Sequence, residues 1–269
     1  MKYCLSGRQN KKYLEKADEI LVEQRDYRYI SDLIIEHPNK TIILDIQDTI
    51  LEDEAFKKSI IEYSKIPTIN FVCAIYNLNA EFIEWFKFNN IKFYYGFSVN
   101  SFYEVRGLID LGVEYIKIHA PLTFNIDLLS KFNCKFRMVP NVAYDAYIPR
   151  INGICGQWVR PEDVQHYENG IYVFEFEDAN LDKEQTLYDI YAEKSEWKGN
   201  LNLLITNLNV EADNRGLPNE IGEARANCGQ RCMQTGACHL CETAFMFERT
   251  LRTKKNELQE FIANQKKNN

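Results

Sequence analysis

Several features that mark common protein classes are missing from this sequence. No run of about 18 apolar residues occurs, so no membrane-spanning helix is predicted. The opening residues, Met-Lys-Tyr-Cys-Leu-Ser-Gly-Arg, are too polar for a secretory signal peptide, and we therefore expect a cytoplasmic protein. Nucleophile-elbow, phosphate-loop and zinc-hydrolase helix motifs are also absent, which argues against the enzyme classes that those motifs identify.

Excess positive charge is missing as well. The chain has 32 Lys and Arg against 39 Asp and Glu, a formal net charge of −7. This balance argues against broad, nonspecific nucleic-acid binding, which depends on clustered basic side chains. Hydrophobic residues make up 45% of the 269 residues and aromatic residues 13%, enough for a substantial core. The length therefore allows one large α/β domain with an appendage, or two small domains.

Short runs rich in apolar, β-branched and aromatic residues recur along the first two thirds of the chain and are typical of buried strands. Eight such runs are present: Lys2–Leu5, Thr41–Ile46, Ile69–Ile75, Lys92–Phe97, Tyr115–His119, Lys135–Val139, Cys155–Val159 and Ile171–Phe176. Most intervals between them place apolar residues three and four apart, the spacing of amphipathic helices. The predicted helices are Tyr13–Val22, Tyr27–Glu36, Ala55–Tyr63, Ala80–Phe88, Phe102–Leu111 and Glu184–Trp197.

Eight strands that alternate with helices predict a (β/α)8 TIM-like barrel over residues 1–200. A doubly wound open sheet is the alternative, but the segment after the first strand, Ser6–Asn10, lacks the glycine-rich phosphate loop that such sheets often carry. Residues 201–269 form a C-terminal extension with a cysteine-rich loop. A long helix is predicted from Thr243 to about Gln265, and its apolar stripe could bind a protein partner.

The cysteine-rich loop holds half of the chain's eight cysteines: Cys228, Cys232, Cys238 and Cys241, spaced C-x3-C-x5-C-x2-C. Without an export signal these residues are expected to be reduced thiols or metal ligands rather than disulfides. Four thiolates in a compact loop could hold a [4Fe–4S] cluster. They could equally form the tetrahedral site of a structural Zn2+, or remain free thiols. His239 lies inside the loop and could replace a thiolate as a ligand, but it is rather expected to face solvent.

Polar residues follow several predicted strands, at the barrel end where TIM-barrel active sites lie. His119 is the acid–base candidate, and its alternative is a hydrogen-bonded core histidine. Arg160 could bind a carboxylate or phosphate, or it could pair with Glu162 or Asp163 at a helix start. Asp45 and Glu175 could form a carboxylate pair inside the barrel.

Three more residues of predicted strands have alternative interpretations. Lys117 and Arg137 could each point into the barrel, or could extend a charged group past the strand end. Cys155 could be a reactive thiol or a cluster neighbour, but a small buried side chain is the usual role of a free cysteine.

One region resembles a known family. The segment Cys155-Gly-Gln-Trp-Val-Arg-Pro-Glu-Asp-Val164, followed by Tyr167–Gly170 and Ile171–Phe176, is similar to part of the U32 peptidase-like family. The family's central Glu and His-Gly signature is absent, and Glu175 and Glu177 stand where the family shows basic residues. The resemblance implies a TIM-like barrel, cysteines that hold a [4Fe–4S] cluster, and oxygen-independent hydroxylation of RNA bases or quinone precursors.

Two functions are therefore expected. The first is an iron–sulfur oxidoreductase or hydroxylase-like enzyme that modifies a nucleobase or another small aromatic substrate. The alternative is a non-catalytic assembly protein with a structural zinc in its C-terminal extension, which binds a partner through the C-terminal helix. A peptidase is the weakest reading, because no nucleophile and base motif supports it.

Overall fold

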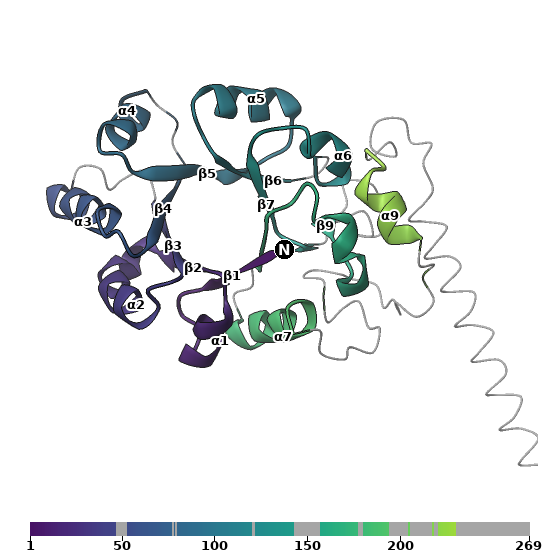
Figure 1. Ribbon diagram of the computed structural model, residues 1–269, viewed down its shortest axis with the longest axis horizontal. Coiled ribbons are helices and arrows are strands. Elements are labelled where there is room, and N and C mark those ends of the chain that lie inside the picture. Colours follow the sequence, from purple (N-terminus) through teal and green to yellow (C-terminus); the bar gives the residue numbers. More distant parts are fainter. Residues whose placement is uncertain are drawn as a thin grey trace, which may run out of the picture.

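A closed barrel of eight parallel strands forms the body of the protein in the computed structural model (Figure 1). The structure describes residues 1–46, 53–76, 78, 80–119, 122–142, 157–176, 180–193, 204, 217 and 220–229. Each barrel strand pairs with the next one along the chain, and β10 closes the barrel between β7 and β1. The predicted TIM-like α/β barrel is therefore confirmed.

The barrel strands are short, and most of their side chains are buried. They are β1 (Lys2–Ser6), β2 (Glu19–Glu23), β3 (Thr41–Ile46), β4 (Asn70–Ile75), β5 (Lys92–Val99), β6 (Tyr115–Ile118), β7 (Lys135–Met138) and β10 (Val173–Glu175). Two further strands, β8 (Asn141–Val142) and β9 (Gln157–Trp158), form a separate antiparallel pair.

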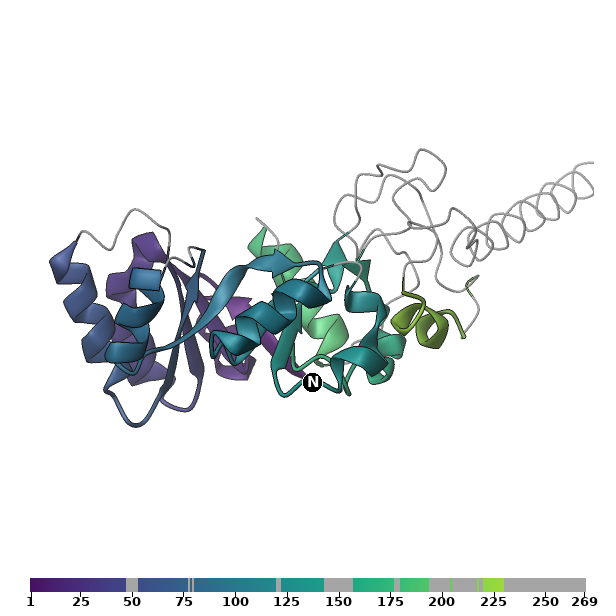
Figure 2. The same ribbon diagram turned by 90° about the horizontal axis from the view of Figure 1, so that it is seen from above.

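Helices surround the ring of strands, as Figures 1 and 2 show. The α-helices are α1 (Lys11–Lys16), α2 (Ile30–Glu36), α3 (Glu54–Ser64), α4 (Ala80–Phe88), α5 (Phe102–Asp110), α6 (Ile126–Leu129), α7 (Leu181–Tyr191) and α9 (Ile221–Ala226). The 3-10 helices are η1 (Gln24–Tyr29), η3 (Leu122–Phe124) and η4 (Pro161–His166). No helix in the described part of the chain is long and apolar enough to cross a membrane.

The second barrel strand lies where the sequence predicted a helix. Helix α1 ends at Lys16, and β2 follows directly at Glu19. In β2 the apolar side chains of Ile20 and Val22 are buried, whereas Glu19 carries a charged group into the barrel. The strand was missed because a charged residue at an inward position removed the expected apolar alternation, and the remaining apolar residues matched helical spacing.

A second prediction, the barrel strand at Cys155–Val159, was also wrong. In the described part of that run, residues 157–159, Gln157–Trp158 forms a strand that pairs with β8 outside the barrel. The barrel instead passes from β7 to β10. The expected number of strands was right because this false barrel strand replaced the missed β2.

Helix α9, in the C-terminal extension, packs against η4 and η3 on the outside of the barrel (Figure 1). The buried Arg225 guanidinium lies 3.8 Å from the Trp158 ring centroid and 5.2 Å from that of Phe124. A Cβ atom on Gly222 would overlap the Asp163 carboxylate, so a larger residue would force Asp163 to move. The predicted helix Thr243–Gln265 lies outside the described residues.

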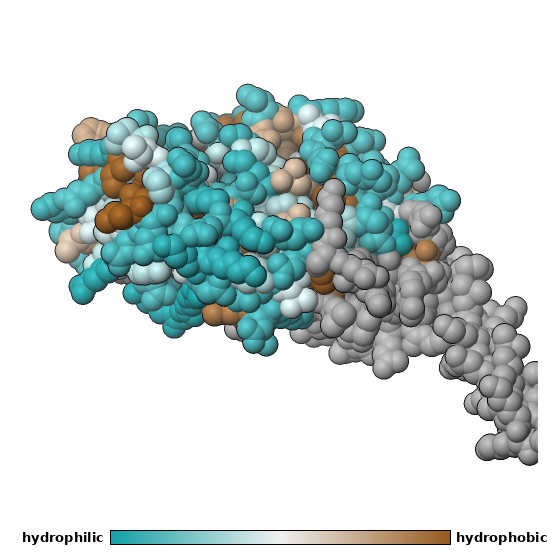
Figure 3. Space-filling view, turned by 60° about the horizontal axis from the view of Figure 1, so that its bottom comes forward, coloured by the Kyte–Doolittle hydropathy of each residue, from teal (hydrophilic) through white to brown (hydrophobic). Residues whose placement is uncertain are grey.

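Outward-facing strand residues and the helices bury a continuous apolar core, which includes Ile42, Phe86 and Phe174. The outside of the molecule is mostly hydrophilic on the face drawn in Figure 3, where hydrophobic residues gather mainly toward one end. The inside of the barrel differs from the apolar core and from the exposed surface, because it contains charged side chains that are buried.

Candidate functional site

A buried network of charges crosses the barrel interior. Glu175, at the end of β10, accepts hydrogen bonds from Lys117 Nζ on β6 (2.9 Å) and from Arg137 Nε on β7 (2.8 Å). On its other side, Arg137 Nη1 lies 3.3 Å from Glu19 Oε2 on β2. The Arg137 guanidinium also lies 4.6 Å from the centroid of the Tyr94 ring. Two acids and two bases from four strands therefore fill the centre of the barrel, and their formal charges cancel.

The network holds its charges despite its burial. Burial opposes ionisation of Glu175, but Lys117 and Arg137 outweigh it and lower the pKa of Glu175 to about 2. Burial also opposes the charge of Arg137, yet Tyr94 and Glu175 keep the pKa of Arg137 well above its usual value. Glu19 differs, because burial raises its pKa more than Arg137 lowers it. Lys117 and Arg137 thus point into the barrel, the first of their two predicted alternatives.

Asp45 lies near the carboxyl-terminal end of β3, closer to the barrel mouth than the charge network. The side chain is half-buried, and burial raises its pKa. A hydrogen bond from Tyr76 lowers the pKa, whereas the negative charge of Glu175 raises it further. Asp45 and Glu175 were expected as a carboxylate pair. The charge of Glu175 acts on Asp45, but Glu175 itself is paired with Lys117 and Arg137.

Aromatic rings lie beside Asp45 at the ends of β4 and β5. Tyr76 packs edge-on against Phe97 with their centroids 4.9 Å apart, and Tyr95 lies 5.6 Å from Phe97. Gly96 makes room for this arrangement, because a Cβ atom there would lie 2.6 Å from the Tyr76 ring. The pairing of β5 with β6 is irregular between Tyr95 and Val99, as strands often are next to active sites. Phe97 is left 54% exposed.

His119 follows β6 at the same end of the barrel, as predicted. Its backbone N–H donates to Val99 O at 2.7 Å, which ties the end of β6 to the end of β5. Burial, with a smaller contribution from Lys117, lowers the pKa of the half-buried imidazole. Burial thus raises the pKa of Asp45 and lowers the pKa of His119, which favours the neutral form of each group.

Arg160 does not belong to this site. It follows β9, outside the barrel, and its buried guanidinium binds Asp163 through Nε (2.5 Å) and Nη2 (2.9 Å). This is the ion-pair alternative that the sequence allowed. The expected place of Arg160 at a barrel strand end was wrong because β9 is not a barrel strand.

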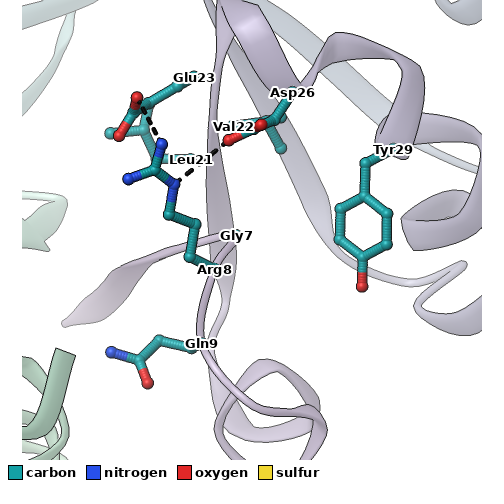
Figure 4. Close-up of a pocket in the computed structure, with 8 residues that line it drawn as sticks. All are labelled: Gly7, Arg8, Gln9, Leu21, Val22, Glu23, Asp26 and Tyr29. Atoms are coloured by element: carbon teal, nitrogen blue, oxygen red, sulfur yellow. Dashed lines mark hydrogen bonds and ion pairs between the residues drawn. The ribbon is translucent and has the colours of Figure 1, made fainter.

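A cavity of about 390 Å³ opens at the carboxyl-terminal ends of β1 and β2 (Figure 4). Arg8 lies across it, with Nη2 2.9 Å from Glu23 and Nε 3.2 Å from Asp26. The Tyr29 ring forms the opposite wall in Figure 4. The cavity was not predicted, since the loop after β1 was judged only for the phosphate-binding glycines that it lacks.

The predicted metal ligands Cys232, Cys238 and Cys241 lie outside the described residues. Cys228 is described; it is half-buried and follows the C-cap residue of α9, Asn227. The next residue, Gly229, has a φ of +62° and donates its N–H to Phe124 O at 2.8 Å. Within the described ranges, no three His, Cys, Asp or Glu side chains are placed to hold a metal ion.

Sequence reasoning missed Glu19, Tyr76 and Phe97. Glu19 was hidden in a predicted helix, although its place between apolar residues could have suggested an inward charge. Phe97 ends a predicted strand, but nothing in the sequence indicated that it would stay exposed. Searches find no matching family model and no matching curated protein.

Proposed function

We propose that this protein is a TIM-barrel enzyme of the U32-like kind that modifies a nucleobase or another small aromatic ring at the barrel mouth. The observation that carries the proposal is the exposed Phe97 ring, held by Tyr76 beside Asp45. An exposed aromatic face at the functional end of a barrel provides a surface on which a planar ring can stack.

We call the rings of Tyr76, Tyr95 and Phe97 the aromatic platform. Polar groups around this platform can form hydrogen bonds with the edge of a bound ring. The Asp45 carboxyl group, with its raised pKa, can accept or donate a hydrogen bond to a ring heteroatom. The neutral form of His119 is favoured and can accept a proton. Below them the charge network keeps Lys117 and Glu175 in place and gives the mouth a fixed electrostatic field.

In this proposal the redox chemistry comes from a [4Fe–4S] cluster held by Cys228, Cys232, Cys238 and Cys241. Such a cluster supplies single electrons at a potential that its surroundings set. The half-buried side chain of Cys228 could supply one thiolate of such a ligand set, and Gly229 fixes the beginning of the cysteine segment against Phe124. These contacts support the cluster; the resemblance of the sequence to the U32 family supplies the rest of the argument.

Ring binding is tested with Phe97→Ala. Loss of a stacking surface is expected to weaken the binding of nucleosides or of 4-hydroxybenzoate roughly 5- to 150-fold. The matched control is Phe88→Ala on α4, an 89% exposed phenylalanine away from the mouth, which should leave binding unchanged. Equal affinities of Phe97→Ala and the wild-type protein, measured by equilibrium dialysis, would contradict the proposal.

The cluster is tested by purifying the protein without oxygen. Iron and sulfide should be present with a broad visible absorption band, and Cys228→Ser should reduce all three. Cys134→Ser is the matched control, because Cys134 is also half-buried but is not one of the four proposed ligands. Protein without iron and without the band would exclude the cluster.

A second function, a non-catalytic assembly protein with a structural zinc, is favoured by one observation. The charges of Glu19, Lys117, Arg137 and Glu175 fill the barrel centre. These side chains are 2–10% exposed and bind one another, an arrangement that stabilises a scaffold whether or not a substrate binds at the mouth. One zinc per chain, together with no aromatic binding by the wild-type protein, would favour this function over the enzyme.

A further inference from the structure

The cavity beside Arg8 lies at the barrel mouth but on different strands from the aromatic platform. Its walls come from the loop after β1, which carries Gly7 and Arg8, and from β2 with η1 (Figure 4). Its volume of about 390 Å³ lies within the range of small-molecule sites, roughly 300–1,000 Å³. A separate binding function can therefore be considered for it.

The wall that carries Arg8 is held in place on both sides. Gly7 N–H donates to Leu21 O at 2.7 Å, which joins the loop to β2. The Gln9 side chain turns away from the cavity and donates to the buried Glu184 carboxylate of α7 at 2.6 Å. Gln185 donates to the amide oxygen of Gln9 at 2.7 Å. The loop is therefore shaped before any ligand arrives, which lowers the entropic cost of binding.

Arg8, Glu23 and Asp26 line the cavity, and their charges are balanced by Arg25, which pairs with Glu23 but is not part of the cavity wall. Arg8 binds Glu23 and Asp26, and Arg25 Nη2 also lies 2.7 Å from Glu23. An anion would compete with two carboxylates for Arg8. A cation would compete with two guanidinium groups for the carboxylates. The balance favours a neutral ligand that forms hydrogen bonds without displacing the ion pairs.

The remaining groups indicate the kind of neutral ligand. Arg8 and the carboxylates of Glu23 and Asp26 place donors and acceptors side by side, a pattern that neighbouring hydroxyl groups can satisfy. Tyr29, 43% exposed, offers a ring face on the other wall. We propose that this cavity, which we call the Arg8 pocket, binds a neutral monosaccharide. The proposal does not depend on the aromatic platform or on the iron–sulfur cluster.

The test is an NMR titration of the 15N-labelled full-length protein. Two neutral sugars, D-glucose and D-ribose, are compared with two charged sugars, glucuronate and glucosamine. Neutral sugars are expected to shift the backbone signals of Gly7, Arg8 and Asp26 in a saturable way. The charged sugars should bind less tightly. No saturable shifts with any neutral sugar, or a preference for glucuronate, would overturn the proposal.

Arg8→Gln sharpens the test, because it removes the cation and leaves two carboxylates. Affinity for the neutral sugar is expected to fall at least about tenfold, and glucosamine should become the preferred ligand. Arg106→Gln on α5 is the matched control, since Arg106 is exposed and away from the pocket. Equal sugar binding by Arg8→Gln and Arg106→Gln would show that the shifts do not come from the Arg8 pocket.

Discussion

Two groups of four charged residues, each with two acids and two bases, lie in very different surroundings. The inner group lines the barrel interior, and its side chains are 2–10% exposed. The outer group borders the Arg8 pocket, and its side chains are 39–65% exposed. The inner group is Glu19, Lys117, Arg137 and Glu175; the outer group is Arg8, Arg25, Glu23 and Asp26.

The comparison shows that equal composition does not mean equal function. In the inner group water is excluded, so a charge that loses its partner cannot be solvated again. In the outer group water screens each pair, so that the pairs contribute little to stability, and their remaining donors and acceptors stay accessible to a ligand. The inner group therefore fixes the barrel, and the outer group is suited to reversible binding.

The largest effect should come from removing the central acid of the inner group. Glu175→Gln leaves Lys117 and Arg137 with a neutral partner, and we expect the free energy of unfolding to fall by about 3–5 kcal/mol. Urea denaturation followed by circular dichroism measures this change. If Glu175→Gln does not fold, Lys117→Met provides a second measurement, because it leaves Glu175 with Arg137 alone.

The matched control is Glu23→Gln in the outer group, which also changes one acid between two bases. Its cost should stay below about 1 kcal/mol because its partners remain hydrated. Similar losses for Glu175→Gln and Glu23→Gln would remove the distinction between the two groups.

Acid should reduce the contribution of Glu175 in a defined range. Its pKa is about 2 in the folded protein, below the usual value of 4.5. The unfolded chain therefore binds the proton first as the pH falls, and the stabilisation that is complete above pH 4.5 is lost as the pH approaches 2. The stability difference between wild type and Glu175→Gln should shrink between these values. A difference that stays constant down to the acid limit of folding would contradict the assigned ionisation.

Much of the fold could be predicted, because most strands and helices bury apolar side chains at regular spacing. Helix α4 has the predicted bounds, and β3 does as well. The failures have a physical cause. Strand β2 carries Glu19 into the barrel, a charge that only the three-dimensional pairing with Arg137 can accommodate. Nothing local to the sequence encodes that pairing.

The candidate site was predictable only in part for the same reason. Asp45, His119 and Glu175 were expected at the mouth, because polar residues at strand ends follow from the barrel topology. Arg160 was misplaced together with its strand. The Arg8 pocket could not be predicted, because its residues become neighbours only when β1 and β2 pair.

A medium effect is expected at the aromatic platform, where Gly96 lies against the Tyr76 ring. Gly96→Ala places a Cβ atom about where the Tyr76 ring lies, 2.6 Å from its nearest carbon. We expect a loss of about 1–3 kcal/mol, as in other overpacked sites, together with weaker aromatic binding. Gly107→Ala on α5 is the control, because no atom lies within 4 Å of a Cβ there. Equal stability of the two variants would mean that Tyr76 moves freely and does not hold Phe97.

The smallest effect should be found in the outer group, and salt should identify it. Asp26→Asn removes one of the two carboxylates on Arg8, whose Nε lies 3.2 Å from Asp26. The cost should be below about 1 kcal/mol at low ionic strength, because both side chains are hydrated. It should fade toward zero near 1 M salt, where the screening length is about 3 Å. The cost of Glu175→Gln should persist in the same salt, because ions do not enter the barrel. If the cost of Asp26→Asn did not change with salt, the outer group would be as shielded from water as the inner group. The Arg8 pocket would then have no hydrated ion pair to which a sugar could bind.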